Sequence, residues 1–216
     1  MRVWISKYAA LAALTVLAGC AAQPPMAEKS AEPYHIRGTL AAVDGGKLAI
    51  VTDDGSTVTV TLGEGAGLFI VDNASMDDIL PGKFVGITSI ESGGRRVALE
   101  VHVFDEALRG LAEGHYPWDL VAEPNMMTNA AVGSVLDKGA GARELRVTYW
   151  EAGGEIPNKG GVSVFVPPDA KFVTLSQTTA DKLVPGEAIW VLATDTDTGI
   201  VSPAVAIGQN GIVPPF

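Results

Sequence analysis

Residues 57–62 read Thr57-Val58-Thr59-Val60-Thr61-Leu62, an uninterrupted alternation of polar and apolar side chains. Successive side chains of a strand point to opposite faces, so this period of two predicts a strand with one buried and one solvated face. Turn residues separate it from the apolar runs before it, as Asp44-Gly45-Gly46 and Asp53-Asp54-Gly55. Asp-Gly pairs supply the positive φ angles that tight hairpins require. We therefore expect strands at 35–43, 47–52 and 57–62.

The order of elements that follows is repeated later in the chain. A short helix is expected at 75–80, with Ser75 as its cap, and again at 178–183. Two strands follow each helix, and Pro81-Gly82 has its counterpart 104 positions later in Pro185-Gly186. This order predicts an all-β fold of two tandem small OB-like β-barrel units with one short helix each. Because periodicity predicts strands but not closure, a single-sheet meander stays open as the alternative.

Composition limits the classes of protein that fit. Of the 216 residues, 47% are hydrophobic and 19% are charged, which excludes a disordered polyelectrolyte. Lys and Arg total 15 against 25 Asp and Glu, a net charge of −10 that argues against nucleic acid as a partner. The single cysteine excludes an internal disulfide and any zinc site with several thiolates.

The first twenty residues have the pattern of an export signal. Arg2 and Lys7 precede an apolar run at 8–19, which is too short to span a bilayer, since spanning needs about 20 residues. The run ends in Leu17-Ala18-Gly19-Cys20, which resembles the lipobox of bacterial lipoproteins. The resemblance implies that Cys20 is acylated and anchors the protein; an ordinary cleaved signal with an incidental cysteine is the alternative. Ala21, in place of Asp, implies sorting to the outer membrane, on its periplasmic face.

These patterns divide the chain into six parts. They are a signal peptide at 1–19, the lipidated Cys20 with a flexible tether at 20–33, β-unit 1 at 34–104, a connector at 105–129, β-unit 2 at 130–208, and a C-terminal tail at 209–216.

A string of short motifs carries a family resemblance over nearly all of the mature chain. The string resembles a proteobacterial family of exported proteins and lipoproteins of unknown function with OB-like repeats, and it implies no established activity. The motifs are Glu100-Val101-His102-Val103-Phe104, Leu108-Arg109-Gly110, Glu113-Gly114-His115, Pro117-Trp118-Asp119-Leu120 and Met127-Thr128-Asn129.

The connector and the strand before it hold the candidate site. Glu100 and His102 are two positions apart, so we expect them on one face of their strand, opposite a buried face formed by Val97, Leu99, Val101 and Val103. Imidazole and carboxylate suit zinc or copper(II), and methionine with histidine suits copper(I). The candidate ligands of a divalent metal or copper are Glu100, His102, His115, Asp119 and Met127.

The other interpretation of the connector is structural. Tyr116, Pro117 and Trp118 would fill the groove between the two units, with His115 hydrogen-bonded to Asp119 or to a backbone carbonyl. No nucleophile motif of the G-x-S-x-G type is present, so the sequence predicts no enzyme and no catalytic residues. The expected function is that of a non-enzymatic binding or scaffold protein that is anchored to the membrane by lipid, faces the periplasm, and binds an unknown envelope protein or small ligand. A periplasmic metal-binding protein is the alternative.

Overall fold

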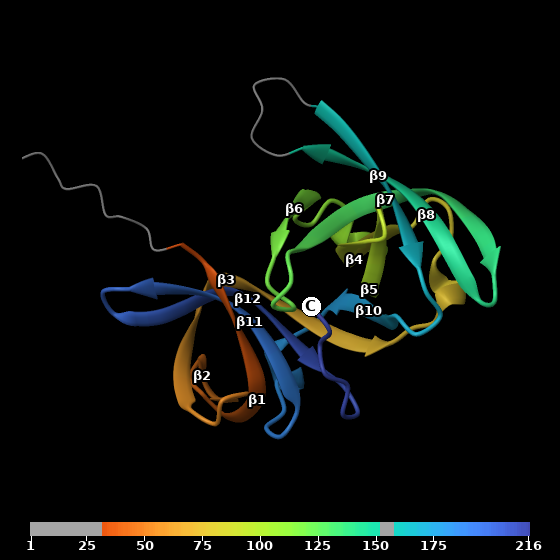
Figure 1. Cartoon of the computed structure of the whole chain (residues 1–216). Helices are drawn as coiled ribbons and strands as arrows, with labels where there is room; N and C mark the ends of the chain where they lie inside the picture. The colour runs from red at the N-terminus through yellow and green to blue at the C-terminus, as the bar shows by residue number, and fades with distance from the viewer. Residues whose placement is uncertain (1–31, 152–157) are drawn as a thin grey trace, which may run out of the picture.

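The computed structural model describes residues 32–151 and 158–216 (Figure 1). Within these ranges the chain forms strands and single turns of 3-10 helix and has no α-helix, which confirms the predicted all-β class. The strands are β1 (Tyr34–Asp44), β2 (Lys47–Thr52), β3 (Thr57–Asn73), β4 (Phe84–Ser92), β5 (Arg95–Phe104), β6 (Gly114–Trp118), β7 (Asn125–Gly139), β8 (Ala142–Glu151), β9 (Asn158–Val166), β10 (Lys171–Gln177), β11 (Ala188–Thr196) and β12 (Gly199–Gly208). The 3-10 turns are η1 (Met76–Asp78), η2 (Glu106–Leu108) and η3 (Ala180–Lys182). The predicted signal peptide and Cys20 lie outside the described residues.

Five strands close into the first barrel, in the order β1-β2-β3-β12-β11 and back to β1. All neighbours are antiparallel except β3 and β12, which run parallel. In Figure 1 the orange strands from the start of the chain and the dark blue strands from its end lie together in this barrel. Its interior is aliphatic: the fully buried side chains include Leu40, Leu48, Ile50, Val60, Ile189, Val191, Val205 and Ile207.

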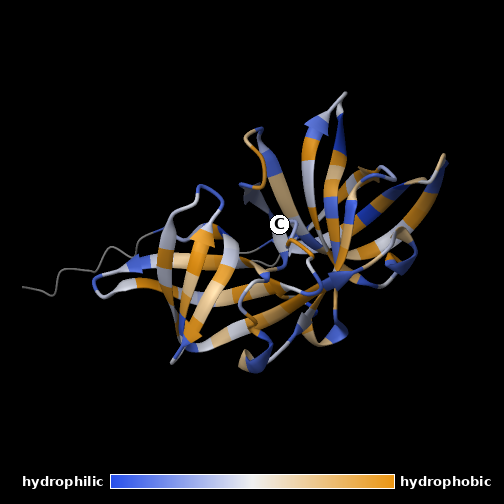
Figure 2. Cartoon of the chain, turned by 90° about the horizontal axis from the view of Figure 1, so that it is seen from below, coloured by the Kyte–Doolittle hydropathy of each residue, from blue (hydrophilic) through white to orange (hydrophobic). Residues whose placement is uncertain are grey.

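The second barrel uses β4, β5, β9, β8 and β7. Four of its five pairings are antiparallel: β4 with β5, β4 with β7, β7 with β8, and β8 with β9. The fifth, between β5 and β9, is parallel and joins Arg96 to Val164 and Val97 to Phe165. Figure 2 shows apolar and polar residues alternating along the strands of both barrels, as expected for strands that bury one face. The buried interior includes Val85, Ile87, Val101, Val103, Ala130, Val132, Leu145, Val147 and Val164.

Each barrel therefore takes three strands from one half of the chain and two from the other. This differs from the predicted tandem arrangement, in which 34–104 and 130–208 would each close on their own strands. The reason is the length of β3, whose 17 residues span roughly 55 Å at the rise of an extended strand. Its second half stays paired with β12 on one edge and extends beyond β2, so that its other edge pairs antiparallel with β10, with Val71 opposite Leu175. The chain after β3 thus builds the second barrel before β11 and β12 return to the first.

The predicted short helices are present as η1 and η3, each a single 3-10 turn. Ser75 caps η1 as expected: its Oγ accepts from the amide of Asp77 at 3.3 Å, and the Asp78 carboxylate accepts from the Ser75 amide at 2.7 Å. Thr179 is the N-cap of η3, but its side chain makes no capping hydrogen bond.

A bulge in β5 changes the predicted buried face of that strand. The β4–β5 register shifts between Thr88 and Ser89, which are opposite Glu100 and Ala98, so Leu99 has no direct partner. As a result Ala98 joins Val101 in the core of the second barrel, and Leu99 is only half-buried. The expectation that Leu99 belongs to the buried face is therefore wrong, because alternation assumed an unbroken ladder.

Candidate functional site

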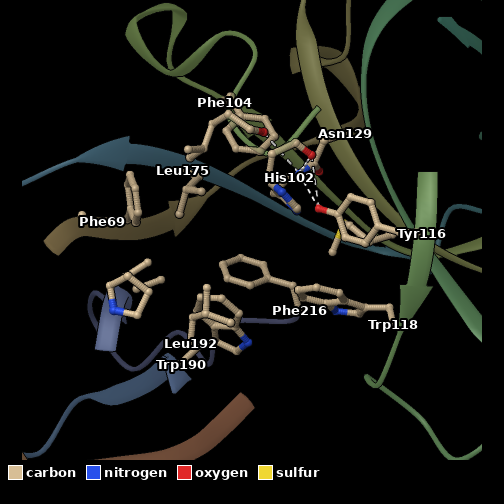
Figure 3. A pocket seen from close by; sticks show the side chains of 17 residues that line it. Phe69, His102, Phe104, Tyr116, Trp118, Asn129, Leu175, Trp190, Leu192 and Phe216 are labelled. Atoms are coloured by element: carbon tan, nitrogen blue, oxygen red, sulfur yellow. Dashed lines mark hydrogen bonds between the residues drawn. The ribbon is translucent and has the colours of Figure 1, made fainter. Parts of the chain in front are cut away.

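An aromatic pocket of about 320 Å³ lies between the two barrels. The outer faces of β3, β11 and β12 line one side, those of β5 and β7 line the other, and β6 from the connector covers it. Figure 3 shows the side chains that converge there. Six of the pocket's 17 lining residues are Phe, Tyr or Trp: Phe69, Phe104, Tyr116, Trp118, Trp190 and Phe216.

Strand register places the polar end of this pocket. Val101 and Val103 point into the second barrel, so His102 between them points outward. On β4, Gly86 is opposite both His102 and Asn129, which brings these two side chains together across the glycine. A Cβ at Gly86 would lie 2.0 Å from His102 Nε2 and 2.6 Å from Asn129 Oδ1. Only glycine leaves room for both groups at this position.

A buried hydrogen-bonded chain supports His102 from behind. Glu100 Oε1 accepts from the amide of Thr88 at 2.9 Å and from its hydroxyl at 2.7 Å. The other carboxylate oxygen, Oε2, lies 3.1 Å from His102 Nδ1. The two side chains are 1% and 3% exposed, so this is a buried pair, and the expectation that they share a strand face is confirmed. With Nδ1 bound to the carboxylate, Nε2 is the ring nitrogen left for a ligand.

The side chain of Asn129 is held in one orientation by its nitrogen, and its oxygen makes no hydrogen bond. Its Nδ2 donates to the carbonyl of Ala112 and to the hydroxyl of Tyr116, each at 3.1 Å. These acceptors determine which end of the amide is nitrogen. Burial raises the pKa of Tyr116 to about 12, so its hydroxyl keeps its proton at neutral pH and donates to the Ala112 carbonyl at 3.2 Å. Asn129 Oδ1 has no partner, although the residue is only 5% exposed.

All the unpartnered buried polar atoms found in side chains of the described ranges belong to the lining of this pocket. They are Asn129 Oδ1, Trp118 Nε1 and Trp190 Nε1. A buried donor or acceptor without a partner costs about 1–3 kcal/mol, so folded proteins rarely leave one. The pocket therefore offers one strong acceptor and two indole donors to a molecule that could enter it.

A charged cluster borders the pocket on the side of β1. Asp119 Oδ1 lies 2.7 Å from both His35 Nδ1 and Arg37 Nη2. Burial alone would raise the pKa of Asp119, but the hydrogen bonds from Arg37 and His35 outweigh it and lower that pKa. The His35 ring packs 4.2 Å from the ring of Trp118, and Arg37 Nε donates to the Phe216 carbonyl at 3.1 Å. This cluster ties the connector and residue 216 to the first barrel.

The five predicted metal ligands do not converge. Glu100, His102 and Met127 lie on the pocket side of the second barrel, whereas Asp119 is bound to His35 and Arg37. His115 Nδ1 is 2.8 Å from Thr128 Oγ1, in place of the expected bond to Asp119 or a carbonyl. In the part of the chain that the structure describes, no three His, Cys, Asp or Glu side chains are grouped so that they could hold a metal ion.

His115 also lies in an environment that disfavours its charged form. Desolvation and the nearby Arg96 lower its pKa, and its ring stacks on that of Tyr149 at 5.8 Å between centroids. Through this stacking, His115 on β6 contacts Tyr149 on β8 of the second barrel.

The three residues predicted to fill the groove between the units take different positions. Tyr116 and Trp118 line the pocket between the barrels, while Pro117, between them on β6, points away and is exposed. The pocket residues that sequence reasoning missed include Phe69, Trp190, Phe216 and Asn129. Trp190 and Phe69 stand in ordinary alternating strands, and nothing local distinguishes them from core residues.

The chain matches no protein-family model, no curated protein and no solved structure. Among the described residues, no helix has the length and apolar character needed to cross a membrane.

Proposed function

We propose that this protein is a non-enzymatic binding protein that takes up a small, largely apolar molecule in the aromatic pocket. The observation that carries the proposal is the coincidence of an apolar pocket of about 320 Å³ with the three unpartnered buried polar atoms in its lining. This volume is at the lower end of the range for ligand sites, about 300–1,000 Å³, and suits a molecule with one or two rings. A few polar groups in an apolar wall are the usual means of orienting such a ligand.

The proposal includes the architecture and the anchor. We take each barrel to be OB-like, because each combines three consecutive strands with a pair of strands that follows a short turn. In the first barrel, β1, β2 and β3 combine with β11 and β12, which follow η3. In the second, β7, β8 and β9 combine with β4 and β5, which follow η1. The strand pairing supports an internal duplication. Val71 and Leu175 pair with each other and are 104 positions apart, and their parallel partners, Gly208 and Phe104, are also 104 positions apart. The lipobox-like sequence that ends at Cys20 supports a lipid anchor, and Ala21 after it supports sorting to the outer membrane, on its periplasmic face.

Binding in the pocket can be tested with cyclohexylmethanol, a neutral probe that does not absorb where tryptophan emits. Adding it to the full chain is expected to shift the emission of Trp118 and Trp190 to shorter wavelength and to saturate. The substitution Ala204→Phe, which fills the pocket, is expected to abolish the shift. Ala42→Phe places the same ring at an exposed strand position outside the pocket and serves as the matched control. Equal titrations of the two folded variants would overturn the proposal.

The anchor has its own test. Mass spectrometry of the exported protein is expected to show Cys20 as the first residue, carrying a diacylglyceryl thioether and an acylated amine. Two or more acyl chains hold a protein stably, whereas one chain gives marginal binding. Cys20→Ser is therefore expected to move the protein from the membrane fraction to the soluble fraction. A free thiol on the mature wild-type chain would contradict the anchor and leave the pocket proposal standing.

A further inference from the structure

The aromatic pocket is selective in the charge that it can accept. Of the charged residue types, only a histidine, His102, is found in its lining, and no lysine or arginine of the described chain lines it. An anion inside the pocket would therefore have no lysine or arginine of the lining beside it, and burial of an unpaired charge in an apolar space is unfavourable. The Glu100 carboxylate stands directly behind His102, and among the described residues its hydrogen-bond partners are Thr88 and His102.

The polar end of the pocket presents acceptors. Asn129 Oδ1 is unpartnered, and His102 Nε2 lies beside it above Gly86. In Figure 3, His102, Asn129 and Tyr116 gather at one end, and Trp118, Trp190 and Phe216 lie across the pocket from them. Two neighbouring acceptors backed by a carboxylate fit a ligand group that carries several hydrogen-bond donors.

The walls favour positive charge as well. Aromatic faces carry negative electrostatic potential and attract organic cations within about 6 Å of a ring centroid, most strongly when the cation is desolvated. Six aromatic side chains line this pocket, and Phe216 lies between His102 and Trp190, with ring centroids 4.9 and 5.7 Å away. The net charge of −10 over the whole chain adds a long-range attraction for cations.

From these features we infer that the ligand is a protonated organic amine, with its ammonium group at Asn129 and His102 and its apolar body against the aromatic wall. This inference rests on the proposed function, since it names the chemical class of the molecule that the pocket takes up. The ammonium donates to Asn129 Oδ1 and to His102 Nε2, while Glu100 holds the imidazole as an acceptor through Nδ1. The structure thus assigns Glu100 a positioning role, which it exerts through His102 without direct contact with the ligand.

Three probes of the same shape separate charge from size. Cyclohexylmethylamine, cyclohexylmethanol and cyclohexanecarboxylate are titrated into the full chain at neutral pH and low salt, with tryptophan emission as the readout. We expect the amine to bind about tenfold more tightly than the alcohol, and the carboxylate to bind most weakly. If the alcohol binds as tightly as the amine, the inference is overturned and the proposed function stands. If none of the three binds, the proposed function fails with it.

Substitution of the polar end provides the second arm. Glu100→Gln removes the negative charge and keeps the shape of the side chain, and it is expected to reduce the tenfold preference for the amine to about twofold or less. Glu91→Gln, at an exposed position on β4, is the matched control and is expected to leave the preference unchanged. Asn129→Leu is expected to weaken the amine more than the alcohol. If folded Glu100→Gln and Asn129→Leu proteins keep the full preference for the amine over the alcohol, the placement of the ammonium at Asn129 and His102 is contradicted. If either variant fails to fold, the three-probe titration of the wild-type protein decides whether the ligand is an amine.

Discussion

Val101→Asp is expected to unfold the second barrel, whereas Leu99→Asp, two positions earlier on the same strand, is expected to leave it folded. Val101 is fully buried in the core, opposite Ile87, so the new carboxylate would lose its hydration without gaining a partner. The effective cost of burying one such ion is several kcal/mol, and the lost apolar contact adds about 1.5–3 kcal/mol. Whole domains are stable by only about 5–15 kcal/mol.

The contrast depends on the bulge. Leu99 sits at the register shift and is only half-buried, so an aspartate there can reach water and costs about 1 kcal/mol, a usual value for a substitution. Thermal unfolding followed by circular dichroism measures both variants. We expect Val101→Asp to lose the part of the transition that belongs to the second barrel, and Leu99→Asp to have a melting temperature lowered by a few degrees. Equal losses would mean that the two residues share one buried face after all.

Removing one member of the buried pair is the second large effect. Glu100→Ala leaves the Thr88 amide and hydroxyl and His102 Nδ1 without their acceptor in a site that is almost closed to water. Breaking a buried pair in this way costs about 3–5 kcal/mol. For a chain of 150–250 residues, that corresponds to a decrease in melting temperature of roughly 6–20 °C.

A double substitution separates the cost of an orphaned group from the value of the pair itself. Replacing both partners, Glu100→Leu with His102→Leu, is expected to recover part of the stability lost in Glu100→Ala, because no unpaired ring remains. Chemical denaturation of the two proteins gives the difference in unfolding free energy, with Glu91→Ala as the exposed control. A double variant less stable than Glu100→Ala would show that the Glu100–His102 pair contributes net stability.

Local features of the fold were predictable from local sequence. The Asp44-Gly45-Gly46 hairpin forms as expected, with Gly45 and Gly46 at φ angles of +52° and +81°. Strict alternation identified the strands, and the two-residue spacing of Glu100 and His102 put them on one face. Ser75 was identified as a cap because its pattern lies within four residues. Each of these inferences needs only contacts between neighbours in sequence.

The partners of the strands were not predictable in the same way. Alternation predicts that β3 has an apolar face, but it does not predict which strand pairs with β3. The predicted tandem unit would have used β5, whereas the structure pairs β3 with β12. The pocket depends on this choice, because the exchange brings Trp190 and Phe216 to His102. Asp119 and His115 are close to His102 in sequence, yet the connector carries them to Arg37 and Thr128 instead. Chain proximity therefore misled the metal interpretation.

The exchange of strands has a consequence for the order in which the chain can fold. A ribosome delivers β1, β2 and β3 first, and the β11–β12 hairpin that closes their barrel follows only after Gln177. Until then β1 and β3 each present an open hydrogen-bonding edge, and open edges invite pairing with other chains. Closure also joins residues more than a hundred positions apart, a separation that slows folding. The newly made protein thus passes through a long interval in which its first-made strands need shielding, and its last-made hairpin ends that exposure.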